Sequence, residues 1–188
     1  MRLVARWEHA MIIIHDVVQG SPEWLELRKD LWTGSKALRL LQGKPLPRET
    51  DFTGNIHTRR GQTLEIVAIR EYERKYNRFV ARPGFVTNTT YSNAGYSPDA
   101  IDGGWLLECK ALNGVRHENL VADKIPLEYL VQVYFGMIIT GKRKARLLAF
   151  NPEYEEQLTV IEIPYYVPIG DNIRKKLKAD MKSRRSIL

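Results

Sequence analysis

The stretch from Tyr96 to Leu112, reading YSPDAIDGGWLLECKAL, constrains the fold of this 188-residue chain more than any other. It begins with a Ser-Pro-Asp turn, passes through a second turn of one aspartate and two glycines, and then becomes mostly apolar from Trp105 onwards. Turn residues followed by a β-prone apolar run predict a buried strand that is entered through a tight turn. The fold is therefore expected to be organised around this strand.

Two carboxylates and one ammonium group lie where this strand is expected to be buried. Side chains alternate between the faces of a strand, so Glu108 and Lys110 point the same way, and Asp99 lies across the turn, close enough to meet them. Charged groups at the end of an apolar strand are costly unless they are paired or bound to a metal. Two converging carboxylates suit a hard cation such as Mg²⁺. A simple ion pair on a solvated face is the alternative, because these residues are common and the bare pattern occurs by chance.

The length of the chain predicts one domain over residues 1–188 with a full hydrophobic core. Its formal net charge of +7 suits a polyanionic partner. The single cysteine, Cys109, excludes an internal disulfide framework and a cysteine-rich zinc site, and it fits a reducing compartment. No apolar run is long enough to cross a membrane and no signal-peptide pattern is found, so a cytoplasmic location without a membrane partner is expected.

Two short helices are expected near the N-terminus. A Ser-Pro-Glu start predicts the first over residues 21–30, with Arg28 on the same face as Trp24. The second is predicted over residues 36–42, with Ser35 available as its N-cap, and a helix N-terminus is a natural site for phosphate. The simpler alternative is that Ser35 only caps the helix and Arg28 only lies on a solvated surface.

Two further polar residues are expected on buried helical faces. After a loop over residues 43–58, the helix predicted over residues 59–77 places Glu65 towards its apolar side without a basic partner on the same helix. The helix predicted over residues 127–140 is apolar nearly all round, so Gln132 should be buried. A buried carboxylate or amide needs partners. The alternatives are that Glu65 reaches solvent and that backbone groups satisfy Gln132.

The remaining segments predict further strands and a basic end. Residues 11–18 indicate a short or edge strand, residues 79–91 one or two strands, and residues 145–151 and 157–163 a hairpin. The tail, about residues 171–188, is rich in lysine and arginine and predicts a basic helix or a frayed arm. A solvated tail is the simpler interpretation, and a contact with the DNA backbone is the alternative.

Taken in order, these motifs resemble those of the phage lambda exonuclease-like viral recombinases, a branch of the PD-(D/E)xK nuclease superfamily. One such motif alone would be weak, whereas an ordered set is specific. The resemblance leaves out the first residues and the basic tail, and the chain is shorter than the lambda-type enzyme in the loop and at the C-terminus. The matching positions are Gln19-Gly20, Trp24 through Arg28 to Thr33-Gly34-Ser35, Gly61, Glu65, Ser97-Pro98-Asp99, Glu108-Cys109-Lys110, Arg116, Tyr129, Gln132 and the stretch through Thr140, with the similarity extending to about Pro152.

The resemblance implies an α/β (α+β) fold with a PD-(D/E)xK restriction-endonuclease-like core, in which helices flank a central mixed β-sheet. It implies Mg²⁺-dependent 5′→3′ exonuclease activity that degrades linear double-stranded DNA from 5′-phosphorylated ends to mononucleotides in phage-type recombination, with Mn²⁺ able to replace Mg²⁺. A homotrimeric ring around DNA and a single-strand annealing protein as partner are further implications.

The resemblance also implies roles for individual residues of this chain. Lys110 would orient or deprotonate the attacking water, and Glu65 and Gln132 would complete the site around the metal and the nucleophile. The implied metal ligands are Asp99, Glu108, Glu65 and the backbone carbonyl of Cys109. The residues implied to bind the terminal 5′-phosphate and DNA are Arg28, Ser35, Ser97 and Arg116.

Two other functions remain open at this point. One is a structure-specific or restriction-type endonuclease on the same fold, and the other is a non-catalytic basic DNA-binding module whose acidic cluster is structural. The implied phosphate-binding residues argue against the endonuclease, because cleavage within a strand needs no pocket for a terminal phosphate. The intact carboxylate and lysine motif argues against the non-catalytic module.

Overall fold

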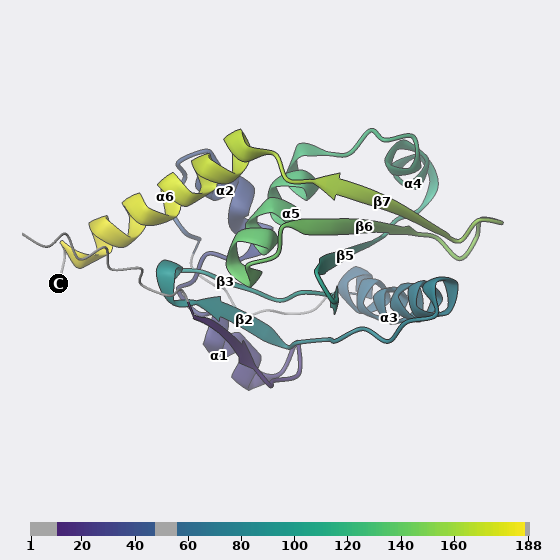
Figure 1. Ribbon diagram of the computed structural model, residues 1–188, viewed down its shortest axis with the longest axis horizontal. Coiled ribbons are helices and arrows are strands. Elements are labelled where there is room, and N and C mark those ends of the chain that lie inside the picture. Colours follow the sequence, from purple (N-terminus) through teal and green to yellow (C-terminus); the bar gives the residue numbers. More distant parts are fainter. Residues whose placement is uncertain (1–10, 48–55, 187–188) are drawn as a thin grey trace, which may run out of the picture.

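A computed structural model of the protein describes residues 11–47 and 56–186, so part of the loop predicted over residues 43–58 lies outside the described residues. The strands form a three-stranded antiparallel sheet, β1–β2–β3, and a four-stranded sheet, β4–β5–β6–β7, in which only β5 and β6 are parallel (Figure 1). The strands are β1 (Ile12–His15), β2 (Phe85–Asn88), β3 (Gly95–Tyr96), β4 (Ala100–Asp102), β5 (Trp105–Ala111), β6 (Lys144–Phe150) and β7 (Leu158–Pro164).

Helices cover both faces of the four-stranded sheet. They are α1 (Pro22–Arg28), α2 (Ala37–Leu41), α3 (Ile56–Tyr76), α4 (Gly114–Val121), α5 (Leu127–Thr140) and α6 (Val167–Arg185), with 3-10 turns η1 (Gly34–Lys36) and η2 (Thr89–Tyr91). One core lies between the sheet and α5, with α2, α4 and α6 contributing to it, and a second core lies between the opposite face and α3. This arrangement confirms the expected mixed sheet flanked by helices. Within the described residues, no helix is long and apolar enough to span a bilayer.

Helix α5 lies very close to the sheet. A Cβ atom added at Gly136 would lie 2.5 Å from Cζ of Tyr96 and 2.7 Å from Cδ2 of Leu106, distances that a real side chain could not adopt. Only glycine permits this approach of the helix backbone to its neighbours. Because residues four apart share a helix face, the same approach brings Gln132 over β5.

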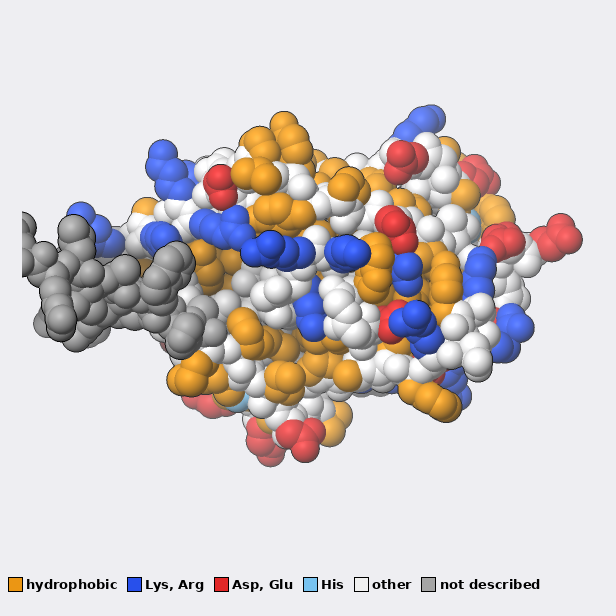
Figure 2. Space-filling view, viewed as in Figure 1, with side chains coloured by type: hydrophobic (Ala, Val, Ile, Leu, Met, Phe, Trp, Pro, Cys, Tyr) orange, Lys and Arg blue, Asp and Glu red, His pale blue; other side chains and the backbone are white. Residues whose placement is uncertain are grey.

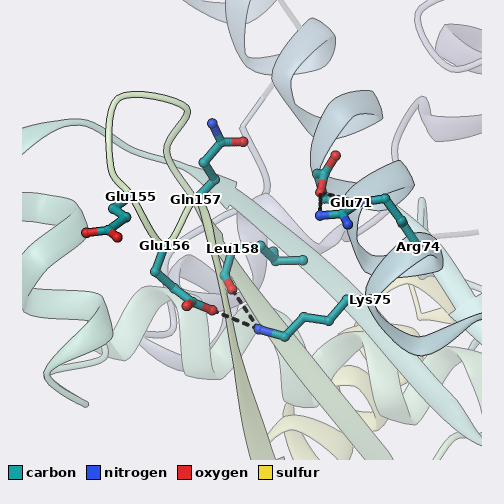
Figure 3. A pocket seen from close by; sticks show the side chains of 7 residues that line it. All are labelled: Glu71, Arg74, Lys75, Glu155, Glu156, Gln157 and Leu158. Atoms are coloured by element: carbon teal, nitrogen blue, oxygen red, sulfur yellow. Dashed lines mark hydrogen bonds and ion pairs between the residues drawn. The ribbon is translucent and has the colours of Figure 1, made fainter.

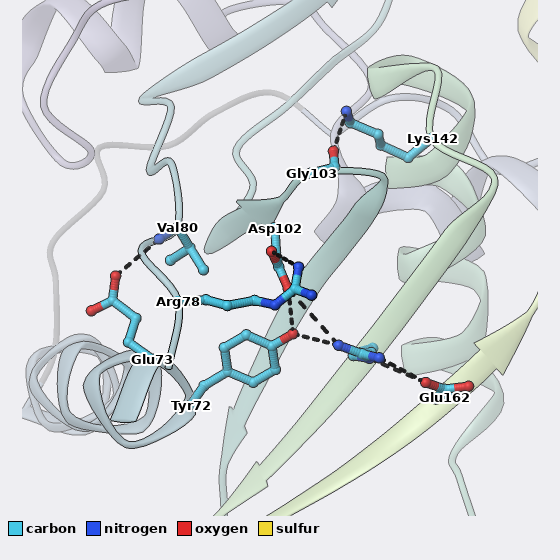
Figure 4. Close-up of polar contacts among 9 residues, drawn as sticks. Tyr72, Glu73, Arg78, Val80, Asp102, Gly103, Lys142 and Glu162 are labelled. Carbon is cyan, nitrogen blue, oxygen red and sulfur yellow. Dashed lines mark hydrogen bonds and ion pairs between the residues drawn. The ribbon is translucent and has the colours of Figure 1, made fainter. Parts of the chain in front are cut away.

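A buried polar network fixes α3 to the other face of the sheet (Figure 4). Asp102 is only 4% exposed, and its carboxylate accepts a hydrogen bond of 2.8 Å from the hydroxyl of Tyr72 on α3. Arg146 on β6 donates to the same hydroxyl at 2.6 Å and forms an ion pair of 2.9 Å with Glu162 on β7. Since α3 also carries Glu65, two turns before Tyr72, the network sets the position of that carboxylate relative to β5.

The structure around Ser35 differs from the expectation. The helix predicted over residues 36–42 is split into η1 and the shorter α2, and a hydrogen bond of 2.9 Å from the amide of Lys36 to the carbonyl of Thr33 closes the 3-10 turn. Ser35 lies inside this turn, and Thr33 and Lys36 occupy the cap positions of η1 and α2. The prediction that Ser35 caps a helix is therefore wrong.

Helix α4 was not expected from the sequence, and α6 was expected only in part. Helix α4 begins at Gly114, where only a turn was predicted, and it is held by the fully buried Leu120. Over residues 171–185 the tail forms the basic helix that was one of the two predictions. It is not wholly solvated, because α6 begins already at Val167 and buries Ile173 and Leu177 completely. Ile173 and Leu177 are four residues apart, so they lie on one face of the helix and anchor it to the larger core.

Candidate active site

Glu108, in the middle of β5, is enclosed by hydrogen-bond donors. Its Oε1 atom accepts from Nζ of Lys110 at 2.8 Å and from Nε2 of Gln132 at 2.5 Å, while its Oε2 atom accepts from the hydroxyl of Tyr96. Lys110 also donates to Oε1 of Gln132 at 3.0 Å, which closes a triangle of three side chains. Because Glu108 is 2% exposed, this is not an ion pair on a solvated face.

Asp99 reaches β5 where the pairing between β4 and β5 ends. The last residue pair on that side is Ala100 with Leu107, so β4 does not cover the edge of β5 beyond it. There, the amide of Cys109 donates to Oδ2 of Asp99 at 2.6 Å. The N–H and C=O groups of a strand residue point to the same edge, so the Cys109 carbonyl points to the edge at which Asp99 lies.

The acidic groups of this site interact strongly. Burial raises the pKa of Asp99 well above its ordinary value, and the nearby charges of Glu108 and Glu65 raise it further. Burial likewise raises the pKa of Glu65 to about 7, with Glu108 adding to the shift and Lys110 and Arg82 opposing it. Burial lowers the pKa of Lys110, but the attraction of Glu108 and Asp99 outweighs it, so the net pKa of that ammonium is raised. The site thus concentrates more negative charge than Lys110 compensates.

The oxygen atoms of this site fit a divalent cation that takes few protein ligands. The carboxylates of Asp99, Glu108 and Glu65 and the carbonyl of Cys109 supply the hard oxygen atoms that Mg²⁺ prefers, and Mg²⁺ usually keeps several waters. A cation among them would offset the burial and the mutual repulsion that together raise the pKa values of Asp99 and Glu65. Among the described residues, no three His, Cys, Asp or Glu side chains lie close enough to enclose a metal by themselves. The backbone carbonyl and water would therefore have to complete the coordination.

Helix α1 connects Arg28 to the segment that carries Asp99. As predicted, Ser21 caps this helix, and the guanidinium of Arg28 lies over the ring of Trp24, with Cζ 3.9 Å from the ring centre. Nε1 of Trp24 donates to Oγ of Ser97 at 2.8 Å. Trp24 thus links two of the residues proposed to bind phosphate, and Ser97 is two residues before Asp99.

Ser35 is brought close to the same cluster by its neighbour in η1. A Cβ atom added at Gly34 would lie 2.6 Å from Cε2 of Tyr96 and 3.2 Å from Cγ of Gln132, so the turn packs directly on two residues that contact Glu108. Ser35 itself is exposed, and its Oγ lies 3.4 Å from Oγ1 of Thr33.

Arg116 lies on α4, apart from the other proposed phosphate-binding residues. It is exposed and lines two cavities of about 250 and 380 Å³, the second of which also includes Tyr129. Nζ of Lys110 lies 4.9 Å from the centre of the Tyr129 ring, so this cavity is close to the lysine. Among the described residues, no hydrogen bond joins the side chain of Arg116 to Arg28, Ser35 or Ser97.

The YqaJ-like viral recombinase domain matches residues 23–143 of the chain, which include every predicted site residue. The chain belongs to this family. An alkaline exonuclease from Laribacter hongkongensis, LHK-Exo, has a similar structure, with a TM-score of 0.75, 21% identity, and coverage of 88% of this chain and 93% of that chain. The structure of LHK-Exo in complex with dAMP gives a TM-score of 0.74 at the same identity and coverage.

A phage related exonuclease from Haemophilus somnus 129PT is more distant, with a TM-score of 0.52, 14% identity, and coverage of 90% of this chain and 93% of that chain. No curated protein matches the sequence. Because these identities are below 25%, the structural similarities show the fold alone, and that fold agrees with the expected mixed sheet flanked by helices.

Two aromatic residues of this recombinase domain were not assigned to the site from the sequence. Tyr96 was not recognised as a partner of Glu108, and Trp24 was placed only on the face of Arg28. Tyr96 comes just before the Ser-Pro-Asp turn, which was the available signal, since that turn brings the flanking residues towards β5.

A separate pocket of about 380 Å³ lies between α3 and the turn joining β6 and β7 (Figure 3). Four of its five charged residues are paired within the pocket, Arg74 with Glu71 at 2.7 Å and Lys75 with Glu156 at 2.8 Å. It contains none of the predicted site residues of the recombinase domain, so we do not include it in the active site.

Proposed function

We propose that this viral recombinase domain is a metal-dependent 5′→3′ exonuclease that degrades linear double-stranded DNA from 5′-phosphorylated ends to mononucleotides during phage-type recombination. The observation that carries the proposal is the convergence of Asp99, Glu108, Lys110 and Gln132 at the uncovered edge of β5. The names of LHK-Exo and of the Haemophilus somnus protein as exonucleases support it.

The side chains of the site have distinct roles in this proposal. Mg²⁺, or Mn²⁺ in its place, would be held by Asp99, Glu108, Glu65 and the carbonyl of Cys109, and would supply a Lewis acid and an activated water. Glu108 and Gln132 hold Nζ of Lys110 in a fixed position. Because the pKa of this ammonium is raised, it would orient the attacking water by donating to it rather than accept its proton.

The end of the strand would be recognised through its phosphate. Arg28 and Ser97, linked through Trp24, and Ser35 on η1 would bind the terminal 5′-phosphate, together with Arg116 beside the cavity near Lys110. Holding the terminus at a fixed distance from the metal explains stepwise removal of single nucleotides. Sequence readout is not required, so contacts with the DNA backbone should dominate.

Digestion of linear DNA but not of covalently closed circular DNA tests this function. With Mg²⁺, the wild-type protein should release mononucleotides from linear duplex and leave the closed circle intact, and EDTA should stop the reaction. Cleavage of the circle would favour an endonuclease, and survival of both substrates with retained binding would favour a non-catalytic module.

We expect Arg28 and Arg116 to confer a preference for 5′-phosphorylated ends. A guanidinium grips phosphate oxygens in a bidentate fork, and a charge-assisted hydrogen bond is worth roughly 1.5–3 kcal/mol. Arg28→Ala or Arg116→Ala should therefore slow digestion of 5′-phosphate duplexes by about tenfold to a hundredfold. The rate of digestion of duplexes with 5′-hydroxyl ends should change less, because these ends carry no phosphate to occupy the pocket.

Rates on both kinds of duplex should be compared with those of Arg74→Ala, whose arginine pairs with Glu71 away from the proposed pocket. This control should keep the wild-type preference. Equal digestion of both ends by the wild type, or full preference in both pocket variants, would show that the phosphate-pocket assignment is wrong even if the metal site is right.

We further expect a ring-forming oligomer, a trimer around DNA, that works beside a single-strand annealing protein. A ring lined with cations would hold a polyanion, and the formal net charge of +7 per chain favours this. Sedimentation should give a particle of three 21.8 kDa chains. Only monomer at micromolar concentration, both with and without DNA, would rule out the trimer.

A further inference from the structure

Four cations form one row on the outward face of α6. Lys175, Lys178, Lys182 and Arg185 are three, four and three residues apart, so they lie along the same side of the helix, and all four are exposed. Within residues 11–47 and 56–186, none of their charged groups takes part in an ion pair or a side-chain hydrogen bond. We call this set the α6 cationic row.

The acidic residues of α6 do not neutralise the row. Asp180 is turned towards the body of the domain, where it accepts from Nδ2 of Asn93 at 2.8 Å and pairs with Nε of Arg184 at 2.7 Å. Asp171, the fifth residue of α6, pairs with Arg174 at 3.0 Å. Figure 2 shows lysine and arginine side chains along α6, at the left of the molecule. Beyond the first turns, the outward face is therefore positive throughout.

The row is held rigidly to the part of the chain that carries the proposed phosphate pocket. Nη1 of Arg184 donates to the carbonyl of Asp30 at 2.8 Å, two residues after Arg28. Nδ2 of Asn93 donates to the carbonyl of Leu177 at 3.0 Å, and Asn93 belongs to the segment that leads to Ser97. Because α6 is anchored to both segments, its cations keep a fixed position relative to them.

We propose that the α6 cationic row binds the phosphate backbone of duplex DNA away from the end that is being processed. The row spans about 15 Å at a rise of ~1.5 Å per residue. Duplex DNA carries one charge per ~1.7 Å of its axis, so several phosphates fall within that length. Lysine contacts phosphate as a point charge, so this surface binds any sequence. The inference rests on the proposed function only in taking duplex DNA as the ligand.

A duplex closed by a hairpin loop at each end separates this surface from the phosphate pocket, because it has no terminus. Its binding should be measured by fluorescence anisotropy in EDTA over a range of salt concentrations. The test variant is Lys175→Gln/Lys178→Gln/Lys182→Gln. The matched control is Arg70→Gln/Arg74→Gln/Lys75→Gln, which removes three exposed cations from α3 and changes the net charge equally.

The test variant should bind the closed duplex about tenfold to a hundredfold more weakly, and its salt slope should fall by roughly two to three, since each lost phosphate contact contributes ~0.9. The control should stay within about twofold of the wild type with an unchanged slope. Thermal melting should show both variants folded, because the replaced side chains are exposed. On linear DNA, the test variant should raise KM and keep kcat.

Arg28→Ala should behave differently from the test variant. It should bind open-ended 5′-phosphate duplex more weakly and bind the closed duplex as the wild type does. An equal loss in both triple variants, no loss in the test variant, or no binding of the closed duplex by the wild type would each overturn the surface assignment. Because these measurements involve no cleavage, a protein that binds through the row but fails to degrade linear DNA would refute the proposed function and leave the surface standing.

Discussion

Asp99→Ala or Glu108→Ala is expected to abolish cleavage of linear duplex DNA, while DNA binding in Ca²⁺ persists. The two carboxylates meet at the uncovered edge of β5. Burial, and then the charge of Glu108, raise the pKa of both Asp99 and Glu65, so these acidic groups interact. Removing one would remove a proposed metal ligand, whereas phosphate contacts elsewhere on the protein would remain. Gel-based digestion in Mg²⁺ and anisotropy in Ca²⁺ measure the two properties separately.

Glu155→Ala is a suitable control, because this carboxylate is exposed on the turn joining β6 and β7, away from the site. Asp99→Asn should accompany Asp99→Ala, since alanine also removes the acceptor for the Cys109 amide and could lower stability. Normal turnover by Asp99→Ala or Glu108→Ala would place the active site elsewhere.

Lys110→Ala is expected to slow cleavage by at least ~100-fold, the usual scale for a positioned proton-transfer group. Its ammonium donates to Glu108 and Gln132 and lies near the ring of Tyr129. Alanine would leave these partners without the cation that they position. Single-turnover rates at saturating Mg²⁺ measure the chemical step.

Lys144→Ala serves as the comparison, because Lys144 is an exposed residue of the neighbouring strand that lies over Trp105. It should cleave at the wild-type rate. If Lys110→Ala also kept that rate, Lys110 would be only a structural partner of Glu108.

Local patterns in the sequence predicted much of the framework. The alternation along β5 placed Glu108 and Lys110 on one face, and the Ser-Pro start predicted α1 with Ser21 as its cap. Helical spacing predicted α3 and α5, because each has a long apolar side that must be buried. In these cases the residues that decide the structure are close together in the chain.

The contacts that complete the site could not be predicted in the same way. The hydrogen bond from Trp24 to Ser97 joins residues 73 positions apart, and the packing of Gly34 on Gln132 depends on how η1 meets α5. Ser35 was misassigned as a cap for the same reason, since tertiary packing, rather than helix propensity, decides where the tight turn lies. For α6 the sequence left a basic helix and a frayed arm both open, because only two fully buried apolar side chains, Ile173 and Leu177, anchor its basic sequence.

The surroundings of Glu108 also restrict which side chain can occupy that position. Lys110 and Gln132 donate to one of its oxygens and the hydroxyl of Tyr96 to the other. Glutamine has nearly the same shape as glutamate, and a tyrosine hydroxyl can accept as well as donate, so glutamine could keep all three hydrogen bonds if its nitrogen donated to Tyr96. It could not supply the negative charge that pairs with the largely buried Lys110. Glu108 is consequently the counter-ion that allows an ammonium to be buried beneath α5, and Glu108→Gln should lower the melting temperature more than Glu108→Gln combined with Lys110→Met.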